Sequence, residues 1–328
     1  MGFTAISKAK LAFYWCASCG GCEESIIDLA EELLKLEAAA EVVFWPMAQD
    51  TKYEDLCSLK DHDITACLIN GAVRMDEHEH MARLLRQKSK MIIAHGACAQ
   101  LGGVYGLANL FDRAEILKKS YIQVPSVGNS PAVLPRTETV VSGGTLSLPR
   151  FYKRVLPLDA VVEVDCYIPG CPPTPSLVLD AIRGSIQGTL PEAKCVLGET
   201  EALCATCPRR ATLPEDLGAK RFKRLFEAAW DATGCFLGQR LICLGPVTRG
   251  GCEARCIKAN MPCRGCFGPT ENVRDQGAKA VAFLASMLAT EDEQTLRDIV
   301  ESIPDPAGLF YRYSLPSSIL KGTWKGEP

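Results

Sequence analysis

Cysteine is the residue type in this chain whose number and spacing could do chemistry. The 328 residues include 17 cysteines, an odd number. A disulfide scaffold would suit a short secreted chain, and this chain is neither short nor patterned for secretion. A reduced enzyme with one nucleophilic thiol needs far fewer, so metal ligation is the chemistry that the composition predicts.

The first set of candidate ligands, group one, is spread over the first half of the chain. It consists of Cys19 and Cys22 in WCASCGGCEES, Cys98 in HGACAQLGG and Cys171 in IPGCPPTP. A C-x-x-C turn lets two sulfurs reach one iron–sulfur cluster, and Gly20 and Gly21 allow the backbone to come close. The alternative is four buried, inert cysteines. Cys16, three residues before the pair, is a spare thiol.

Eight further cysteines lie between residues 204 and 266, with two C-x-x-C pairs and one C-x3-C among them. They divide into group two and group three, which are Cys204, Cys207, Cys235 and Cys243, and then Cys252, Cys256, Cys263 and Cys266. Two four-cysteine zinc sites would share this spacing with two iron–sulfur clusters. Zinc would make the region structural and iron–sulfur clusters would make it an electron path. Spacing alone leaves both open.

The remaining cysteines and the histidines are weaker candidates. Four cysteines without partner spacing are expected in the core: Cys57, Cys67, Cys166 and Cys195. The EHEH segment 77–80 is expected to be a solvated helix start, whereas His95 ends a predicted strand beside group one and could support that group. The sequence has no Walker loop and no G-x-G-x-x-G fingerprint, so nucleotide binding has no support.

The elements that must position group one form an alternating pattern. Short apolar runs that end at Gly, Pro or Cys predict buried strands at 10–15, 41–46, 64–71, 91–96 and 161–170. Helical patterns lie between them, at 25–36, 78–87 and 176–186. This alternation predicts an α/β fold, with a parallel sheet covered by helices on both faces. Ligands in such folds bind beyond the carboxyl ends of the strands, which is where the cysteines of group one fall.

The character of the chain changes near residue 200. Segment 204–266 has several glycines, eight cysteines and no convincing strand, which predicts a small loop-rich domain held together by metal centres. A mostly apolar helix at 277–289 and a Pro-containing tail follow. We therefore expect one domain at 1–195 and a second at 196–328.

Overall composition excludes several classes of protein. The net charge is −3, which gives no reason to expect a nucleic acid or an anionic membrane as partner. No apolar run approaches the roughly 20 residues of a membrane span. The first residues lack the apolar core and cleavage site of a signal peptide and lack an Arg-Arg pair. We expect a cytoplasmic chain without a direct membrane span.

Three motifs carry a resemblance to a known family. WCASCGGCEESIIDL, GACAQLGG and PGCPPTP, in this order, resemble the small subunits of nickel–iron hydrogenases and, more distantly, the 20 kDa-type subunit of respiratory complex I. The segment CLGPVTRGGCEARCIKANMPCRGCFGPT (243–270) is similar, more narrowly, to the gamma subunit of cytoplasmic, methyl-viologen-reducing hydrogenases that associate with heterodisulfide reductase. The resemblance covers nearly the whole chain up to about residue 290.

The resemblance implies three 4Fe–4S clusters in two domains. A flavodoxin-like domain (1–195) would hold the proximal cluster on group one, and a ferredoxin-like domain (196–328) would hold the other two. Group two would bind the distal cluster and group three the medial cluster. Cys204 stands where periplasmic relatives have a His, and Cys256 can supply the ligand that a Pro replaces in their medial cluster. Because the spacing from Cys256 to Cys263 is shorter than theirs, one ligand could belong to the other set.

The resemblance also implies partners. The nickel–iron site would lie on a separate large subunit, because this chain lacks the paired C-x-x-C motifs that bind nickel and iron there. The chain would relay electrons from H2 oxidation to an iron–sulfur or flavin-containing acceptor subunit of the heterodisulfide-reductase or electron-bifurcating type. Three alternatives remain: the small subunit of a deazaflavin- or NAD(P)-reducing hydrogenase, a complex I 20 kDa-type subunit, and a zinc scaffold. The complex I type carries a tandem Cys-Cys and lacks groups two and three.

Overall fold

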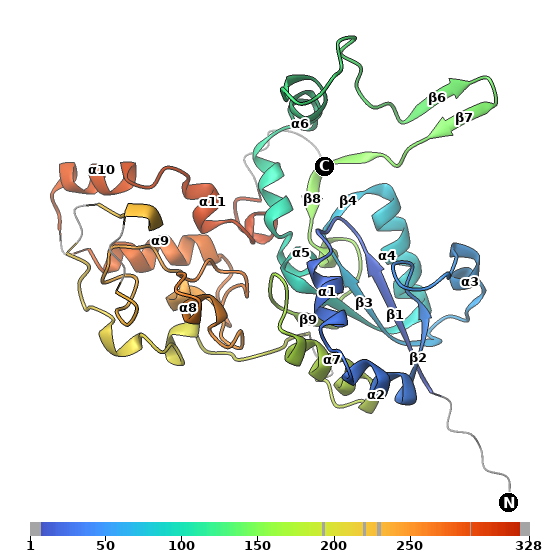
Figure 1. Cartoon of the computed structure of the whole chain (residues 1–328), viewed down its shortest axis with the longest axis horizontal. Helices are drawn as coiled ribbons and strands as arrows, with labels where there is room; N and C mark the ends of the chain where they lie inside the picture. The colour runs from blue at the N-terminus through green and yellow to red at the C-terminus, as the bar shows by residue number, and fades with distance from the viewer. Residues whose placement is uncertain (1–7, 192–193, 219–220, 228–230, 289, 322–328) are drawn as a thin grey trace, which may run out of the picture.

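In the computed structural model, the first half of the chain folds around a parallel sheet. The structure describes residues 8–191, 194–218, 221–227, 231–288 and 290–321. The six strands of the sheet lie in the order β10-β9-β5-β3-β1-β2 (Figure 1). They are β1 (Ala9–Trp15), β2 (Ala40–Phe44), β3 (Ile64–Asn70), β5 (Ser89–His95), β9 (Cys166–Ile168) and β10 (Cys195–Val196). Counted along the chain, the first five strands have the spatial order 2-1-3-4-5 of flavodoxin-like folds. The predicted α/β fold with a parallel sheet is confirmed.

Helices cover both faces of this sheet, as the alternating pattern predicts. On one face, Ile26 and Ile182 pack against Leu11, Leu68 and Ile93. They belong to the helices α1 (Gly21–Ile27) and α7 (Pro175–Gln187), and α2 (Glu32–Ala39) lies on the same side. The helices of the other face are α3 (Tyr53–Ser58), α4 (Asp76–Lys88) and α5 (Gly96–Leu101).

Two predicted elements differ from the structure. The helix predicted at 25–36 is divided, because Ala30 adopts a left-handed φ of 49° between α1 and α2. Ile26, Leu29, Leu33 and Leu36 still face one core, so the apolar periodicity continues across the break and conceals it. The strand predicted at 161–170 is β9 alone; the valines before it are buried in the core without strand pairing.

A projecting segment interrupts the α/β order between α5 and β9. It contains α6 (Arg113–Lys118) and a hairpin of β6 (Glu138–Val141) and β7 (Gly144–Ser147), which pair only with each other. The chain returns along β8 (Phe151–Leu156), which pairs antiparallel with β4 (Val73–Met75). Figure 1 shows the hairpin standing away from the sheet, and every residue from 131 to 150 is exposed.

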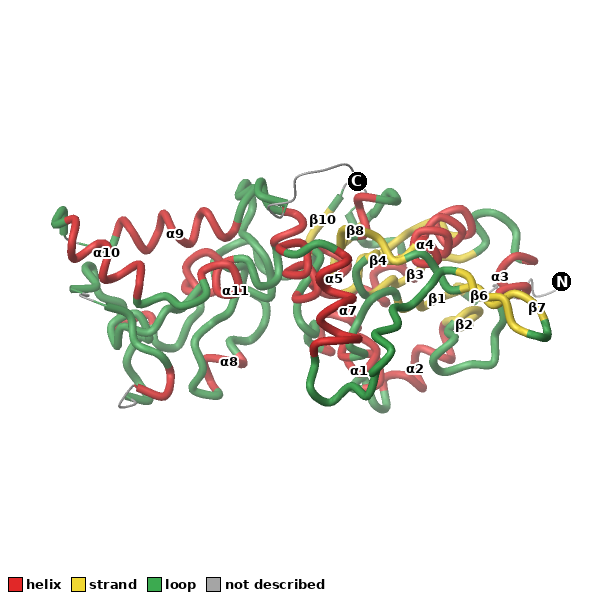
Figure 2. Tube along the Cα trace, turned by 90° about the horizontal axis from the view of Figure 1, so that it is seen from above, coloured by secondary structure: helices red, strands yellow, loops and turns green. Residues whose placement is uncertain are grey.

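The second half of the chain has its own apolar core and little regular structure. Its helices are α8 (Arg255–Lys258), α9 (Gln276–Ser286), α10 (Glu293–Glu301) and α11 (Pro306–Phe310), which Figure 2 shows gathered at the end of the molecule away from the sheet. Leaving aside residues 219–220 and 228–230, segment 204–266 contains no strand. α9 confirms most of the predicted helix 277–289, whose last residue lies outside the described residues. The predicted tail instead carries α10 and α11.

Hydrophobic clusters divide at the same place. Two large clusters draw on residues between 9 and 197, and a third draws on residues between 203 and 311. A domain boundary between residues 195 and 196 stays a prediction, and it would fall inside β10. No helix of the described part of the chain is long and apolar enough to span a bilayer.

Candidate iron–sulfur cluster site

The structure brings the four thiols of group one together at one edge of the sheet. Cys19 and Cys22 follow β1, Cys98 lies in α5 after β5, and Cys171 follows β9. Burial raises the pKa of Cys22, and the thiols of Cys98, Cys171 and Cys19 raise it further. Burial also raises the pKa of Cys98 to about 12, with contributions from Cys171 and Cys19. Each thiol thus lies in the electrostatic reach of the others.

Glycine backbone makes this convergence possible. Gly96 has a φ of +87° and Gly103 a φ of +62°. A side chain at Gly96 would collide with the Cys22 sulfur, and one at Gly103 would collide with the Cys98 sulfur. The Ala97 N–H donates to the Gly170 carbonyl at 2.6 Å, which joins the loop of Cys98 to that of Cys171. Glycine at these two positions leaves the space that the sulfurs occupy.

Cys16 and His95 take other places. Cys16 is 4% exposed in the core of the sheet half. Its pKa is raised by burial and by Glu77, and no thiol of group one acts on it. The Ser25 hydroxyl donates to the Cys22 carbonyl at 2.7 Å and lies 3.2 Å from His95 Nε2. Burial lowers the pKa of His95 to about 3, so the ring is neutral. Because the Ser25 hydroxyl already donates its proton to the Cys22 carbonyl, it accepts a hydrogen bond from His95 Nε2–H. His95 thereby supports the turn of Cys22.

Group two gathers in the second half of the chain. Burial raises the pKa of Cys204 to about 12, and the thiols of Cys243, Cys207 and Cys235 add to the shift. Burial raises the pKa of Cys243 to about 11, which the backbone N–H groups of Gly245 and Cys263 oppose by donating to its sulfur. The structure therefore brings the four cysteines of group two near one another.

The cysteines of group three are less clearly separated from those of the other two groups. Burial raises the pKa of Cys266 to about 12, with contributions from Cys171, Cys256 and Cys252. Cys263 lies between two groups: burial raises its pKa, and Cys243 and then Cys266 raise it further. The Cys263 N–H donates to the Cys243 sulfur at 3.3 Å. Cys263 and Cys243 thus form the contact between the two C-terminal groups.

The three groups form a row. Group one adjoins group three, because the Cys171 N–H donates to the Cys266 sulfur and the Cys171 thiol raises the pKa of Cys266. Group three adjoins group two through Cys263 and Cys243. Group three therefore lies between the other two, although group two precedes it in the chain.

The donor set fits iron–sulfur clusters. Among the described residues, no three His, Cys, Asp or Glu side chains are arranged to hold a metal ion. A 4Fe–4S cluster has a different requirement, because each of its four irons takes one thiolate. Buried, mutually close thiols hold their protons until a cation replaces them, which is what iron would supply. Backbone N–H groups already donate to sulfurs in all three groups, at Cys98, Cys243 and Cys266.

The other cysteines and His78 correct three expectations. Cys67 and Cys166 are buried as predicted, but Cys57 is exposed. Cys166 and Cys195 have no partner spacing in the sequence, yet parallel pairing of β9 and β10 brings their sulfurs to 2.7 Å. His78, expected to be solvated, is only 7% exposed, because it lies on the inner face of α4.

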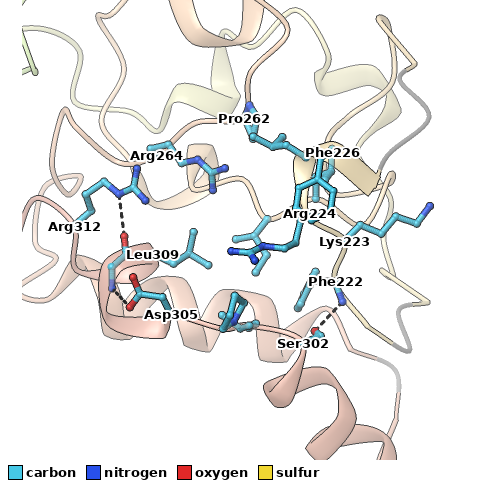
Figure 3. Close-up of a pocket in the computed structure, with 16 residues that line it drawn as sticks. Phe222, Lys223, Arg224, Phe226, Pro262, Arg264, Ser302, Asp305, Leu309 and Arg312 are labelled. Carbon is cyan, nitrogen blue, oxygen red and sulfur yellow. Dashed lines mark hydrogen bonds between the residues drawn. The ribbon is translucent and has the colours of Figure 1, made fainter. Parts of the chain in front are cut away.

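A cationic pocket lies beside groups two and three. It has a volume of about 450 Å³ (Figure 3), and its basic residues are Lys223, Arg224, Arg264 and Arg312. Its acid, Asp305, accepts the Gly308 N–H at 2.8 Å and so caps α11. Arg264 lies between Cys263 and Cys266 in the chain; burial and Arg312 lower its pKa, whereas the Cys243 and Cys263 thiols raise it. In the sequence, the arginine inside the C-R-G-C motif is the feature that could have indicated a basic site next to the cysteines.

Known proteins are similar in sequence to both halves of this chain. The family model described as NADH ubiquinone oxidoreductase, 20 Kd subunit, matches residues 19–184. The iron-sulfur subunit of the F420-non-reducing hydrogenase of Archaeoglobus profundus is 39% identical over 95% of this chain and 97% of its own length. A subunit of the F420-non-reducing hydrogenase of Methanothermobacter marburgensis is 35% identical over 98% of each chain. The solved structure of the NiFeSe hydrogenase from Dm. baculatum has a TM-score of 0.49 at 18% identity, over 81% of this chain and 96% of that one.

Proposed function

This chain belongs to the family of these F420-non-reducing hydrogenase subunits and is an electron-transferring small subunit that pairs with a large subunit, and we propose that it relays electrons from H2 through three 4Fe–4S clusters. The observation that carries this proposal is the row of thiols. Group one, group three and group two each contribute four cysteines, and backbone hydrogen bonds to sulfur join neighbouring groups.

We propose the following ligands, in the order of electron flow. Group one holds the proximal cluster on Cys19, Cys22, Cys98 and Cys171. Group three holds the medial cluster on Cys252, Cys256, Cys263 and Cys266, and group two the distal cluster on Cys204, Cys207, Cys235 and Cys243. The central place of group three in the row supports this order.

The residues of this chain set the conditions of transfer. When bound, the clusters supply one-electron chemistry, and the H2-splitting site lies on the large subunit. Apolar residues bury Cys243 and Cys263, and the N–H groups at Cys98, Cys243 and Cys266 stabilise charge on sulfur. Ligation by cysteine alone keeps each cluster more negatively charged than ligation with a histidine, which favours low potentials. Such a relay suits a low-potential acceptor.

We propose that the acceptor is a heterodisulfide-reductase-type or flavin-containing subunit, in a cytoplasmic hydrogenase of the methyl-viologen-reducing type. The segment 243–270 supports this assignment. The relatives are named as F420-non-reducing, which weighs against the deazaflavin-reducing alternative. The match to the complex I subunit family stops at residue 184 and so excludes the cysteines of groups two and three, which weighs against a complex I subunit.

The cationic pocket supports docking of the acceptor beside groups two and three. Four basic side chains line it, and its one acid is engaged at the start of α11. Phe226, which is 81% exposed, adds an apolar wall. A partner segment with carboxylates and an apolar side chain would match both features, and charge complementarity would also speed its association.

Metal content tests the proposal most directly. Anaerobically purified protein should contain about twelve irons and about twelve sulfides per chain, without nickel or zinc. Its solution should be brown with a broad absorption shoulder. Four irons with two zincs would replace the relay by a zinc scaffold in the second half.

A further inference from the structure

Exposed apolar side chains are concentrated in one segment. Of the 21 exposed large apolar residues in the described part of the chain, 11 lie between residues 104 and 148. They are Val104, Tyr105, Phe111, Tyr121, Val127, Val133, Leu134, Val140, Val141, Leu146 and Leu148. Single exposed apolar residues need no explanation, but this density along one segment indicates a surface that another molecule covers.

The hairpin at the end of this segment is bare on both faces. Thr139 pairs with Leu146 and Val140 with Thr145, so Val140 and Leu146 point to opposite sides. Val140 is 83% exposed and Leu146 is 62% exposed. A two-stranded hairpin without a packed face is marginally stable in water. Its apolar residues therefore point to burial against a partner.

The apolar surface begins over group one. Val104 and Tyr105 follow the loop of Cys98 and are 46% and 40% exposed. The Val104 N–H donates to the Cys98 sulfur, so this surface starts beside a thiol of group one. Exposed apolar residues continue from there through Phe111 and Tyr121 to the hairpin. The surface thus joins the edge of the sheet to the projecting segment.

We propose that residues 104–148, the projecting arm, bind the hydrogenase large subunit and hold its reacting site against group one. The inference rests on the proposed function, because it places the electron donor at the proximal end of the row. A second copy of this chain in symmetric contact through Val104 and Tyr105 would cover group one and exclude the donor. For the acceptor, the proposed docking site is the cationic pocket beside groups two and three.

The large subunit should therefore offer the arm an apolar channel that covers both faces of the hairpin. Interfaces of permanent complexes commonly bury roughly 2,000 Å² or more and are rich in apolar residues, as this arm is. An arm of this kind adds contact area without moving the thiols away from the edge of the sheet.

Two substitutions on the hairpin test the arm in the assembled complex. The double variant Val140→Asp, Leu146→Asp, purified through a tag on this chain, should retain at least tenfold less nickel-bearing large subunit than the parent. Leu34→Asp is the matched control, since Leu34 is 70% exposed on α2, which lies at the opposite end of the sheet from the hairpin in Figure 1. Retention at the parental level in the double variant would overturn the inference.

A photo-crosslinking residue at position 140 identifies the neighbour without depending on loss of binding. Irradiation of the active complex should join this chain to the large subunit, as mass spectrometry of the adduct would show. An adduct with a second copy of this chain, or with the acceptor, overturns the inference about the arm. Twelve irons per chain beyond those of the partner subunits in the same sample would show that the relay stands when the arm assignment fails, whereas missing iron would show that the relay itself fails.

Discussion

The two halves of the chain hold their cysteines in different ways. In the sheet half, the two large apolar clusters contain none of the cysteines of group one, of which only Cys98 joins a small separate cluster with Ala72 and Val155. In the second half, Cys243 and Cys263 belong to the apolar core, and Cys207, Cys235 and Cys252 pack against it. Thiols therefore stand at the edge of one core and form part of the other.

This difference separates two ways of building a metal site. Hydrogen-bonded strands place group one, so we expect the sheet to form without iron. The second half has short helical turns and apolar contacts but, in its described residues, no comparable ladder of strands. Its thiols must therefore help to hold the chain together, as metal ligands do in small domains that bury little apolar surface.

Removal of the clusters should produce the largest difference between the two halves of the chain. Anaerobic chelation of iron should unfold much of 203–270, because that segment loses its cross-links, while β1, β3 and β5 persist. Hydrogen exchange followed by mass spectrometry should show protection factors falling by at least 100-fold in the second half and less than tenfold in the central strands. Equal losses in both halves would mean that the sheet also depends on its cluster.

The sequence predicted the sheet half better than the second half, for a physical reason. Buried strands such as 64–70 are continuous apolar runs, and a parallel sheet requires its ligands at the strand ends. Local patterns were therefore enough to predict most strands and the position of group one at one edge of the sheet. The break at Ala30 was missed because the apolar spacing runs through it, and the Cys166–Cys195 contact because it exists only through strand pairing.

In the second half, the sequence predicted which cysteines are candidate ligands but not which groups of them lie beside one another. Cys263 is three residues from Cys266, yet it also contacts Cys243. The cationic pocket draws on segments as far apart as Phe222 and Arg312. Long-range packing of loops has no periodicity along the chain, so spacing could nominate ligands without showing which groups adjoin.

Loss of a proximal thiol should be the next largest effect. Cys19→Ala removes a thiol of group one and should abolish the proximal cluster and nearly all H2-dependent dye reduction. Cys16→Ala should keep all clusters and most activity, because Cys16 lies in the apolar core beside Cys67. Iron analysis and dye reduction check both variants. Intact clusters in Cys19→Ala, with loss in Cys16→Ala, would reverse the assignment.

Conversion of the medial cluster should have an intermediate effect. Cys256 is the second residue of α8, where proline is tolerated because its missing N–H has no partner within the helix. Cys256→Pro should therefore keep the fold but convert the cluster to 3Fe–4S with a raised potential. The oxidised protein should gain a spin-half paramagnetic resonance signal. Electron flow to the low-potential acceptor should slow while flow to a high-potential dye continues.

An unchanged iron count in Cys256→Pro, without the new signal, would show that Cys256 is not a ligand. The fourth thiolate of the medial cluster would then come from group two, and Cys263, which contacts both groups, would mark where the partition must change.

A charge reversal in the pocket should have a smaller, partner-specific effect. Arg224→Glu should raise the KM for the acceptor subunit by roughly tenfold, since one lost charge contact of about 1.4 kcal/mol is a tenfold change. Dye reduction bypasses the docking surface and reports whether the relay is intact. Arg297→Glu, on exposed α10, is the control. Equal KM values for both variants would move acceptor docking away from the pocket.

The smallest expected effect is a pH dependence confined to the sheet half, which contains all four histidines of the chain. Burial lowers the pKa of His78 to about 4, below its unfolded value of about 6.5. The unfolded chain therefore binds the extra proton first, and the stability due to His78 is complete above about pH 6.5 and is lost as the pH falls toward about 4. The loss should approach about 1 kcal/mol per pH unit, by the linkage of one proton to unfolding.

His78→Gln should reduce this slope between about pH 6.5 and about pH 5, because glutamine cannot take up the proton, while His95, whose pKa burial lowers to about 3, keeps its own contribution. His80→Gln is the matched control, since His80 is exposed on the same helix and bonds the Tyr53 hydroxyl at 2.9 Å. Hydrogen exchange of β3 and β5, corrected for the intrinsic effect of pH, measures the slope. The second half, which has no histidine, should show no comparable slope in this window. A slope there of the same size would assign the pH dependence to thiols or cluster ligation rather than to burial of a neutral imidazole.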